Sequence, residues 1–142
     1  MSSHDDLVVI NSAITQLMRR IARVDNQQGI GKARLSALAV LHFGGPCTMS
    51  ELAESEMVSR PTMHHVVKGL ESDGYVRRIT DARDARRQII RLTAKGTRTI
   101  ERAHAARIQF LSEIAKDIDR AEIREAAKVL DQLRNNAWGL GV

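Results

Sequence analysis

The chain has few of the residue types that build disulfides, metal sites or catalytic sites. Its 142 residues include a single cysteine, Cys47, which excludes an internal disulfide and a zinc site built from several thiolates. None of its five histidines forms the i, i+4 pair that commonly holds a metal, so we expect no metal and no other cofactor. No serine-centred elbow, phosphate-binding loop or paired-carboxylate motif is present. The sequence therefore predicts a protein that is not an enzyme.

Long apolar runs are also missing. No stretch approaches the roughly 20 apolar residues that span a bilayer, and no basic-then-apolar segment with a small-residue cleavage site opens the chain. We therefore expect neither membrane insertion nor secretion. With its single cysteine, the chain is predicted to be cytoplasmic.

Aromatic residues make up only 3% of the chain, and proline occurs twice, at Pro46 and Pro61. Because alanine, leucine and isoleucine are plentiful, most of the chain should be helical. Positive charge is concentrated in one region: residues 60–107 hold 12 Lys and Arg against 5 Asp and Glu, a net charge of +7, and the rest of the chain carries −2. Such a basic region is typical of a nucleic-acid surface.

The central stretch predicts two short helices joined by a turn. Thr48 and Glu51 have the spacing of a capping box that opens the first helix, and Met57 and Val58 then turn the chain. The second helix begins after Ser59, a plausible N-cap, and ends before Gly74. This arrangement is a helix-turn-helix. The apolar stripe of the second helix consists of Met63, Val66, Val67 and Leu70.

The other side of this second helix has hydrogen-bond donors and cations, with no carboxylate before Glu71. Taken alone it could be the solvated side of an ordinary amphipathic helix. A basic hairpin follows it, with strands at 75–80 and 88–92 and arginines in the connector, so the whole predicts a winged helix-turn-helix. An arginine-rich edge that only discourages sheet aggregation is the alternative. The predicted DNA-binding residues are Ser59, Arg60, Thr62, His64, His65, Lys68, Arg83, Asp84, Arg86 and Arg87.

The stretch from residue 52 to residue 96 resembles the MarR family of bacterial transcriptional regulators. The family's wing reads roughly D-x-R-D-R-R and is followed by an apolar strand and L-T-x-x-G. The matching residues here are Asp81, Arg83, Asp84, Arg86, Leu92, Thr93 and Gly96. The resemblance implies that Arg86 enters the minor groove and that Asp84 steadies it. Ala85 departs from the pattern, so Arg83 or Arg87 are alternatives for the inserted residue.

Both ends of the chain carry apolar seams at alternating spacings of three and four residues, from Leu7 to Val24 and from Ile123 to Ala137. A compact winged helix needs neither seam, so we interpret them as a homodimer interface, as the resemblance implies. The alternative is that both fold back on their own protomer. We expect one continuous domain made of a dimerisation helix (1–28), a DNA-binding lobe (32–96), and a connecting helix with a C-terminal dimerisation helix (97–142).

The resemblance also places a regulatory pocket above the DNA-binding lobe. We expect it to take a small aromatic or amphipathic acid, although the histidines among its candidates could equally be ordinary core or surface residues. Cys47 is read as an inert thiol, with an oxidant sensor as the alternative. The candidate pocket residues are Ile14, Leu17, Met18, Leu38, Ala39, His42 and His104.

The sequence thus predicts a mainly α fold with a small β-wing, in which terminal helices form a dimerisation region. The predicted function is a homodimeric MarR-type regulator of double-stranded DNA, a repressor released from a pseudo-palindromic operator by a small molecule. Two alternatives stand beside it. One is a constitutive or architectural winged-helix protein without a ligand, and the other is a winged-helix module for protein contacts.

Overall fold

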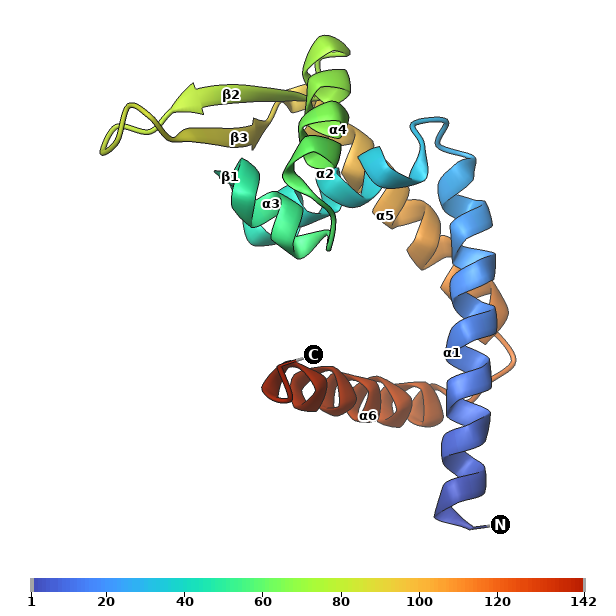
Figure 1. Ribbon diagram of the computed structural model, residues 1–142. Helices are drawn as coiled ribbons and strands as arrows, with labels where there is room; N and C mark the ends of the chain where they lie inside the picture. The colour runs from blue at the N-terminus through green and yellow to red at the C-terminus, as the bar shows by residue number, and fades with distance from the viewer. Residues whose placement is uncertain (1, 142) are drawn as a thin grey trace. The chain divides into compact units, whose positions relative to one another are not determined.

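The fold consists of helices and a small sheet, in a computed structural model that describes residues 2–141 (Figure 1). The predicted winged helix-turn-helix is confirmed. The chain divides into two compact units, of which the first ends at residue 107 and the second begins at residue 108. In chain order the elements are α1 (Ser3–Asn26), α2 (Lys32–Gly44), β1 (Cys47–Thr48), α3 (Met49–Ser55), α4 (Arg60–Ser72), β2 (Val76–Thr80), β3 (Gln88–Leu92), α5 (Ala94–Ala115) and α6 (Arg120–Gly139).

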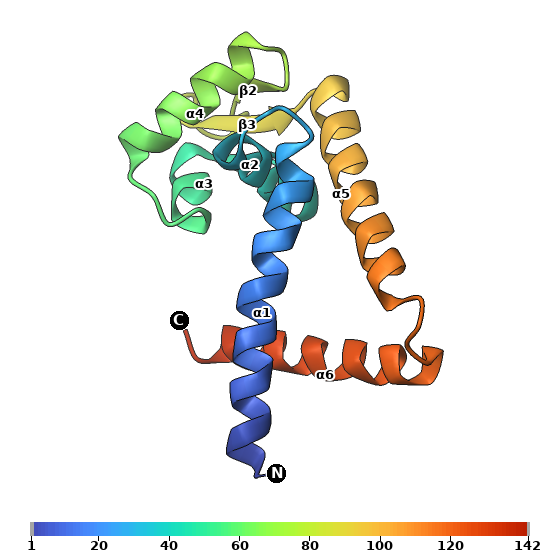
Figure 2. The same ribbon diagram turned by 90° about the vertical axis from the view of Figure 1, so that its right-hand side faces the viewer.

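The core of the first unit lies where α2, α3, α4 and the sheet meet. The predicted stripe of α4 faces it, with Met63, Val67 and Leu70 buried and Val66 half-buried. Leu38 of α2 and Leu52 of α3 are fully buried against them. Figures 1 and 2 show α2 between α3 and α4 on one side and the start of α5 on the other. Every apolar stripe in this lobe thus points to one shared core.

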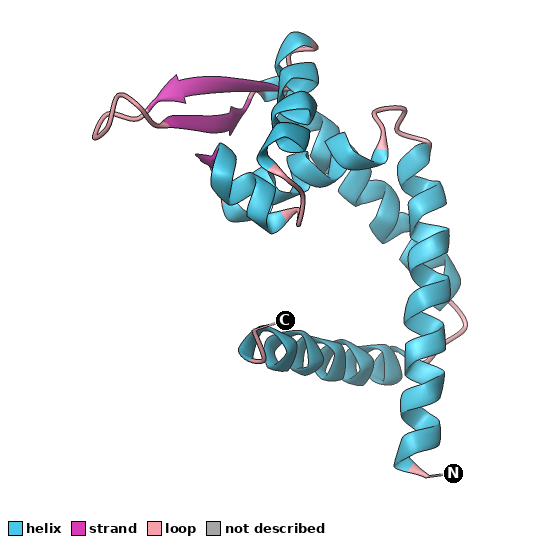
Figure 3. Ribbon diagram, in the orientation of Figure 1, coloured by secondary structure: helices cyan, strands magenta, loops and turns pink. Residues whose placement is uncertain are grey.

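The sheet has the order β1-β3-β2 and is antiparallel throughout. Strands β2 and β3 form the predicted hairpin, which projects from the helices and ends in a loop (Figure 3). The sequence missed β1, whose Cys47 and Thr48 pair with Ile90 and Ile89 of β3. Two residues are too short for an alternating pattern, and only the position of β3 creates this strand.

The joint between the wing and α5 explains the L-T-x-x-G motif. Thr93 accepts a hydrogen bond from the Gly96 amide (3.1 Å) and so caps α5, and its hydroxyl donates to the Gly74 carbonyl (2.6 Å). A Cβ at Gly96 would lie 2.1 Å from the Tyr75 carbonyl oxygen. Only glycine therefore lets α5 begin against the backbone at the base of β2.

Residues 108–141 form the second unit, which includes the end of α5 and all of α6, and none of them is buried. Helix α1 likewise buries no residue. Both terminal helices are amphipathic, as predicted, but most of their large apolar residues are exposed, and Ile10, Ile21 and Val24 of α1 are only half-buried. Among residues 2–141, no helix combines the length and apolarity needed to cross a membrane.

Helices α3 and α4 end in the same backbone motif, which holds one residue at positive φ. The two helices differ in the type of residue at that position. At the end of α3, the Val58 amide donates to the Ala53 carbonyl and the Met57 amide to the Glu54 carbonyl, both at 3.1 Å. The end of α4 repeats this Schellman pattern with Gly74 in the left-handed position. Gly74 has φ +82° and Met57 has φ +56°. The α3 end therefore places a side chain where glycine is preferred.

We expect Met57→Gly and Gly74→Ala to change the free energy of unfolding in opposite directions. Met57→Gly should raise the free energy of unfolding by about 0.5 to 1 kcal/mol, because it relieves the positive φ of an exposed residue. Gly74→Ala should lower it by about 1 kcal/mol for the converse reason. Urea unfolding of both variants measures the difference. Equal shifts of the same sign would contradict the assignment of strain to Met57.

Candidate nucleic-acid interface

Helix α4 presents its polar side outward because its apolar stripe is buried. Arg60, Thr62, His64, His65 and Lys68 are all exposed. Ser59 serves as the predicted N-cap: its hydroxyl accepts a hydrogen bond from the Thr62 amide (3.2 Å) and donates to the Thr62 hydroxyl (2.9 Å). The helix thus offers donors and cations over its first three turns.

The carboxylates near the end of α4 are neutralised by arginines from neighbouring elements. Glu71 lies 3.4 Å from Nε of Arg78 in β2, and Asp73 lies 2.6 Å from Nη1 of Arg34 in α2. These ion pairs therefore offset the negative charge of two carboxylates that would otherwise repel a polyanion. The exposed cations of α4 keep their charge available.

The loop of the wing is shaped by two aspartates. A carboxylate oxygen of Asp81 accepts from the Arg83 amide (2.9 Å), and one of Asp84 accepts from the Arg86 amide (3.0 Å). The backbone closes around them, because the Asp81 amide donates to the Arg87 carbonyl and the Arg87 amide to the Asp84 carbonyl. These short-range bonds give the connector, whose only apolar residues are Ala82 and Ala85, a defined conformation.

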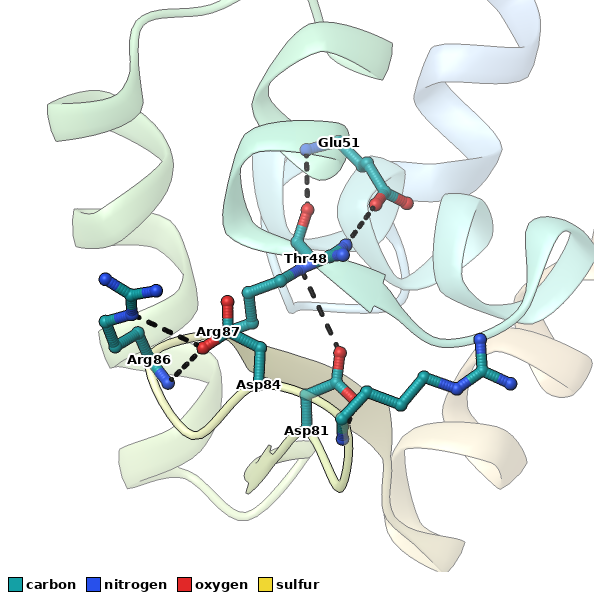
Figure 4. Close-up of polar contacts among 7 residues, drawn as sticks. Thr48, Glu51, Asp81, Asp84, Arg86 and Arg87 are labelled. Atoms are coloured by element: carbon teal, nitrogen blue, oxygen red, sulfur yellow. Dashed lines mark hydrogen bonds and ion pairs between the residues drawn. The ribbon is translucent and has the colours of Figure 1, made fainter.

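The arginines of the loop differ in their surroundings (Figure 4). Arg87 is held internally: its Nη2 lies 3.4 Å from Oε1 of Glu51 in α3, and its Nε lies 3.9 Å from Oδ2 of Asp81. Arg86 is 93% exposed, and Asp84 is its one ion-pair partner within residues 2–141, with Nε 3.5 Å from Oδ1. Arg83 is also exposed. The geometry therefore separates Arg87, which ties the wing to α3, from two arginines that project outward.

Glu51 does not complete the expected capping box. Thr48 caps α3 by accepting from the Glu51 amide (3.2 Å), but the Glu51 carboxylate turns to Arg87 instead of returning to the backbone of Thr48. A charged partner outcompetes the neutral amide. The capping spacing could predict the helix start but not the distant arginine, which lies 36 residues later.

Comparison with known proteins agrees with this geometry. A model of the MarR family matches residues 28–87. The uncharacterized HTH-type transcriptional regulator YwoH of Bacillus subtilis is 31% identical over 117 residues, which cover 80% of this chain and 84% of YwoH. The chain belongs to the MarR family. As the sequence predicted, it is a transcriptional regulator of a DNA-binding family and not an enzyme.

Two further similarities agree with this assignment. YdgJ of Bacillus subtilis, another uncharacterized HTH-type transcriptional regulator, is 30% identical over 108 residues, which are 76% of this chain and 66% of YdgJ. The structure of a MarR family protein from Bacillus stearothermophilus superposes with a TM-score of 0.85 at 20% identity, covering 96% of this chain and 99% of that chain. The second likeness shows the shared fold.

A cavity of about 440 Å³ lies in the first unit of this MarR regulator, lined by α1, α2 and α5. Met18, Ala39 and His104 of the candidate pocket residues line it. Ile14 and Leu17 are exposed earlier on α1, outside the lining. Leu38 is buried in the lobe core. His42 is not among the lining residues but lies beside one of them, Phe43, whose ring centroid is 5.0 Å from that of His42 and 5.6 Å from that of His104.

The sequence did not identify the charged residues that line this cavity, which are Arg19, Asp25, Lys32 and Arg107. Arg107 donates from Nε and Nη2 to the two carboxylate oxygens of Asp25 at 2.8 and 2.5 Å, which joins the end of α1 to α5. These hydrogen bonds raise the pKa of Arg107, so the guanidinium stays charged beside the cavity. The available signal was an arginine within the inward stripe of α5, but no local pattern identified Asp25, 82 residues earlier, as its partner.

Cys47 is half-buried in β1. Burial raises the pKa of its thiol, and the nearby Glu51 carboxylate raises it further. The thiol is therefore mostly protonated at neutral pH, which disfavours oxidation. Over residues 2–141, no three His, Cys, Asp or Glu side chains come together in a way that could hold a metal ion.

Proposed function

We propose that the chain is a homodimeric repressor that binds a pseudo-palindromic operator and is released by a small-molecule ligand. The observation that carries DNA binding is the juxtaposition of the cationic face of α4 with the outward arginines of the wing. In this proposal α4 reads base edges in the major groove, and Arg83 and Arg86 contact phosphates or the minor groove beside it. Ser59, Thr62 and Asp84 orient these contacts.

The exposed terminal seams support a dimer. On α1, Leu7, Ile14 and Leu17 are 56%, 47% and 42% exposed, and on α6 Leu130 and Leu133 are 53% and 40% exposed. Soluble monomers rarely leave such continuous apolar stripes in water. A second copy would cover them, with residues 1–28 and 97–142 as dimerisation segments and 32–96 as the DNA-binding lobe. The two α4 helices would then meet major grooves about 34 Å apart.

Light scattering should therefore report two chains at micromolar concentration. Leu130→Glu should give monomers, because burying a charge in an apolar interface is costly. Gln132→Glu adds the same charge on the other side of α6 and serves as the control, which should remain dimeric. Wild-type protein that stays monomeric would overturn the proposed dimer.

The second expectation separates the DNA contacts by role. Arg86→Ala should weaken binding to operator and random duplex alike and make the slope of log K against log salt shallower by about one unit per protomer. His65→Ala should instead change base preference at a defined position, with about 1 to 3 kcal/mol less discrimination there. Fluorescence anisotropy on duplexes selected by the wild-type protein from a random library measures both quantities.

Arg87→Ala provides the internal comparison for Arg86→Ala. It removes the same charge from the same loop, but its guanidinium already pairs with Glu51 and Asp81. Its effect on the salt slope should be smaller. An equal change for both variants would refute the distinction between them, and no binding of any duplex by the wild-type protein would leave the protein-contact alternative.

We also propose the cavity between α1, α2 and α5 as the effector site. Its volume suits a small molecule, Met18, Ala39 and Phe43 supply apolar walls, and Arg107 or His104 would meet a carboxylate. A small aromatic or amphipathic acid is therefore the expected ligand. Release from the operator follows if the ligand favours a dimer conformation that fits the operator poorly.

Reciprocity between ligand and operator tests this proposal. Aromatic and phenolic acids titrated against the free protein should bind about 5-fold to 150-fold more tightly than against the operator complex, a coupling of about 1 to 3 kcal/mol. Arg107→Met should weaken that binding, and Arg124→Met on α6 is the control. Equal affinity for both states would exclude these acids as inducers, and no binding across a broad panel would favour the constitutive alternative.

A further inference from the structure

A second concave surface runs along the flank of α4, away from the wing. This α2–α4 groove has a volume of about 620 Å³, and the start of α2 forms one wall. Three cations line it, Lys32 and Arg34 from α2 and Lys68 from α4, together with His65. No carboxylate is among its lining residues. His64, by contrast, lines the cleft toward Arg86 and the wing.

Arg34 is fixed in this groove by two features of α4. A Cβ at Gly69 would lie 2.3 Å from Nη2 of Arg34, so the guanidinium rests directly on the helix where α4 has no side chain. Asp73, one turn later, accepts from Nη1 of Arg34 at 2.6 Å. A glycine inside a helix is less favourable than alanine, so its place here is explained by the arginine that it admits.

The held guanidinium retains donors for a ligand. Arginine has five N–H groups, and Asp73 is the one hydrogen-bond partner of the Arg34 side chain within residues 2–141. Its side chain is 34% exposed. A planar cation that is already immobilised loses little conformational entropy on binding an oxyanion. The arrangement therefore suits an anion better than a simple strut between α2 and α4 requires.

We propose that the α2–α4 groove binds a backbone phosphate of the operator through Arg34 and Lys32, with Gly69 and Asp73 as positioning residues for Arg34. The inference rests on the proposed function, because it places α4 in the major groove. The major groove of DNA is bordered by a phosphate backbone on each side, so a helix that lies in it has phosphates along both of its flanks. The wing would serve one flank and the α2–α4 groove the other, with His65 and Lys68 common to base and phosphate surfaces.

Arg34→Gln should remove one phosphate contact per protomer. Each contact contributes about 0.9 to the slope of log K against log salt, and Asp73 offsets part of the Arg34 charge. The dimer's slope should therefore be shallower by up to about 1.8, and binding at 0.15 M salt up to about 30-fold weaker. The loss should be the same for random-sequence duplex and for duplexes selected by the wild-type protein. Lys128→Gln on α6, 68% exposed, changes the charge equally and should leave the slope unaltered.

Gly69→Ala tests the position of the Arg34 guanidinium without changing its charge. The added methyl displaces the end of a flexible side chain, so the helix should stay folded while the guanidinium moves. We expect weaker DNA binding at full helicity by circular dichroism, and no additional loss when Gly69→Ala is introduced into the Arg34→Gln variant. An additional loss in that double variant would mean that the methyl meets DNA directly, and would overturn the role of Gly69.

An unchanged salt slope for Arg34→Gln, whatever its effect on thermal stability, would show that Arg34 is only a strut and would overturn the phosphate site. The proposed DNA-binding function would survive that result, because wild-type binding and the Arg86→Ala loss are measured in the same titrations. Failure of wild-type protein to bind any duplex would overturn both.

Discussion

The packing of α4 into the lobe core is the constraint on which the DNA-facing surface depends. Met63, Val67 and Leu70 must leave water together, and at helical spacing this fixes which residues remain outside. The orientation of Arg60, His65 and Lys68 is therefore a consequence of burial. A rotation of α4 that turned those polar side chains inward would expose three large apolar side chains, at roughly 1.5 to 3 kcal/mol each.

Electrostatics then decides which cations remain available. Three acidic residues of the lobe are paired with arginines from neighbouring elements: Asp73 with Arg34, Glu71 with Arg78, and Glu51 with Arg87. Partly exposed pairs like these contribute little stability individually. Their larger effect is to orient the arginines and cancel negative charge near α4. The excess of +7 over residues 60–107 thus becomes a surface property, expressed by Arg60, Lys68, Arg83 and Arg86.

Sequence reasoning succeeded where one local pattern sufficed. The stripe of α4, its cap at Ser59 and its glycine end follow from spacing and side-chain chemistry over a few residues, and the structure confirms them. What it missed depends on distant partners. The short β1 exists because β3 lies beside it, the Glu51 carboxylate turns to Arg87, and Asp25 meets Arg107 across 82 residues. Periodicity has no information about such pairs.

The candidate ligand pocket shows the same division. Spacing could place apolar residues on the inward side of α1 and α2, but the side chains that line the cavity depend on how three helices approach one another. Leu38 lies in the lobe core because its position on α2 faces α3 and α4. Ala39, one residue later, faces the cavity. A step of 100° around one helix separates a structural residue from a lining residue. Identifying the second kind requires the tertiary arrangement.

The Asp25–Arg107 pair offers a way for an effector in that cavity to change the link between α1 and α5. Asp25 is 14% exposed and Arg107 43%, so the pair lies between a surface salt bridge, worth about 0 to 1 kcal/mol, and a buried one, whose rupture costs about 3 to 5 kcal/mol. The proposed acid would offer Arg107 a second carboxylate in place of Asp25. The exchange keeps the guanidinium satisfied, so its net cost is the freed Asp25, which can return to water at the rim. An intermediate cost is what a switch requires, since a weaker link would not hold α1 to α5 without ligand and a stronger one would not yield to a small molecule.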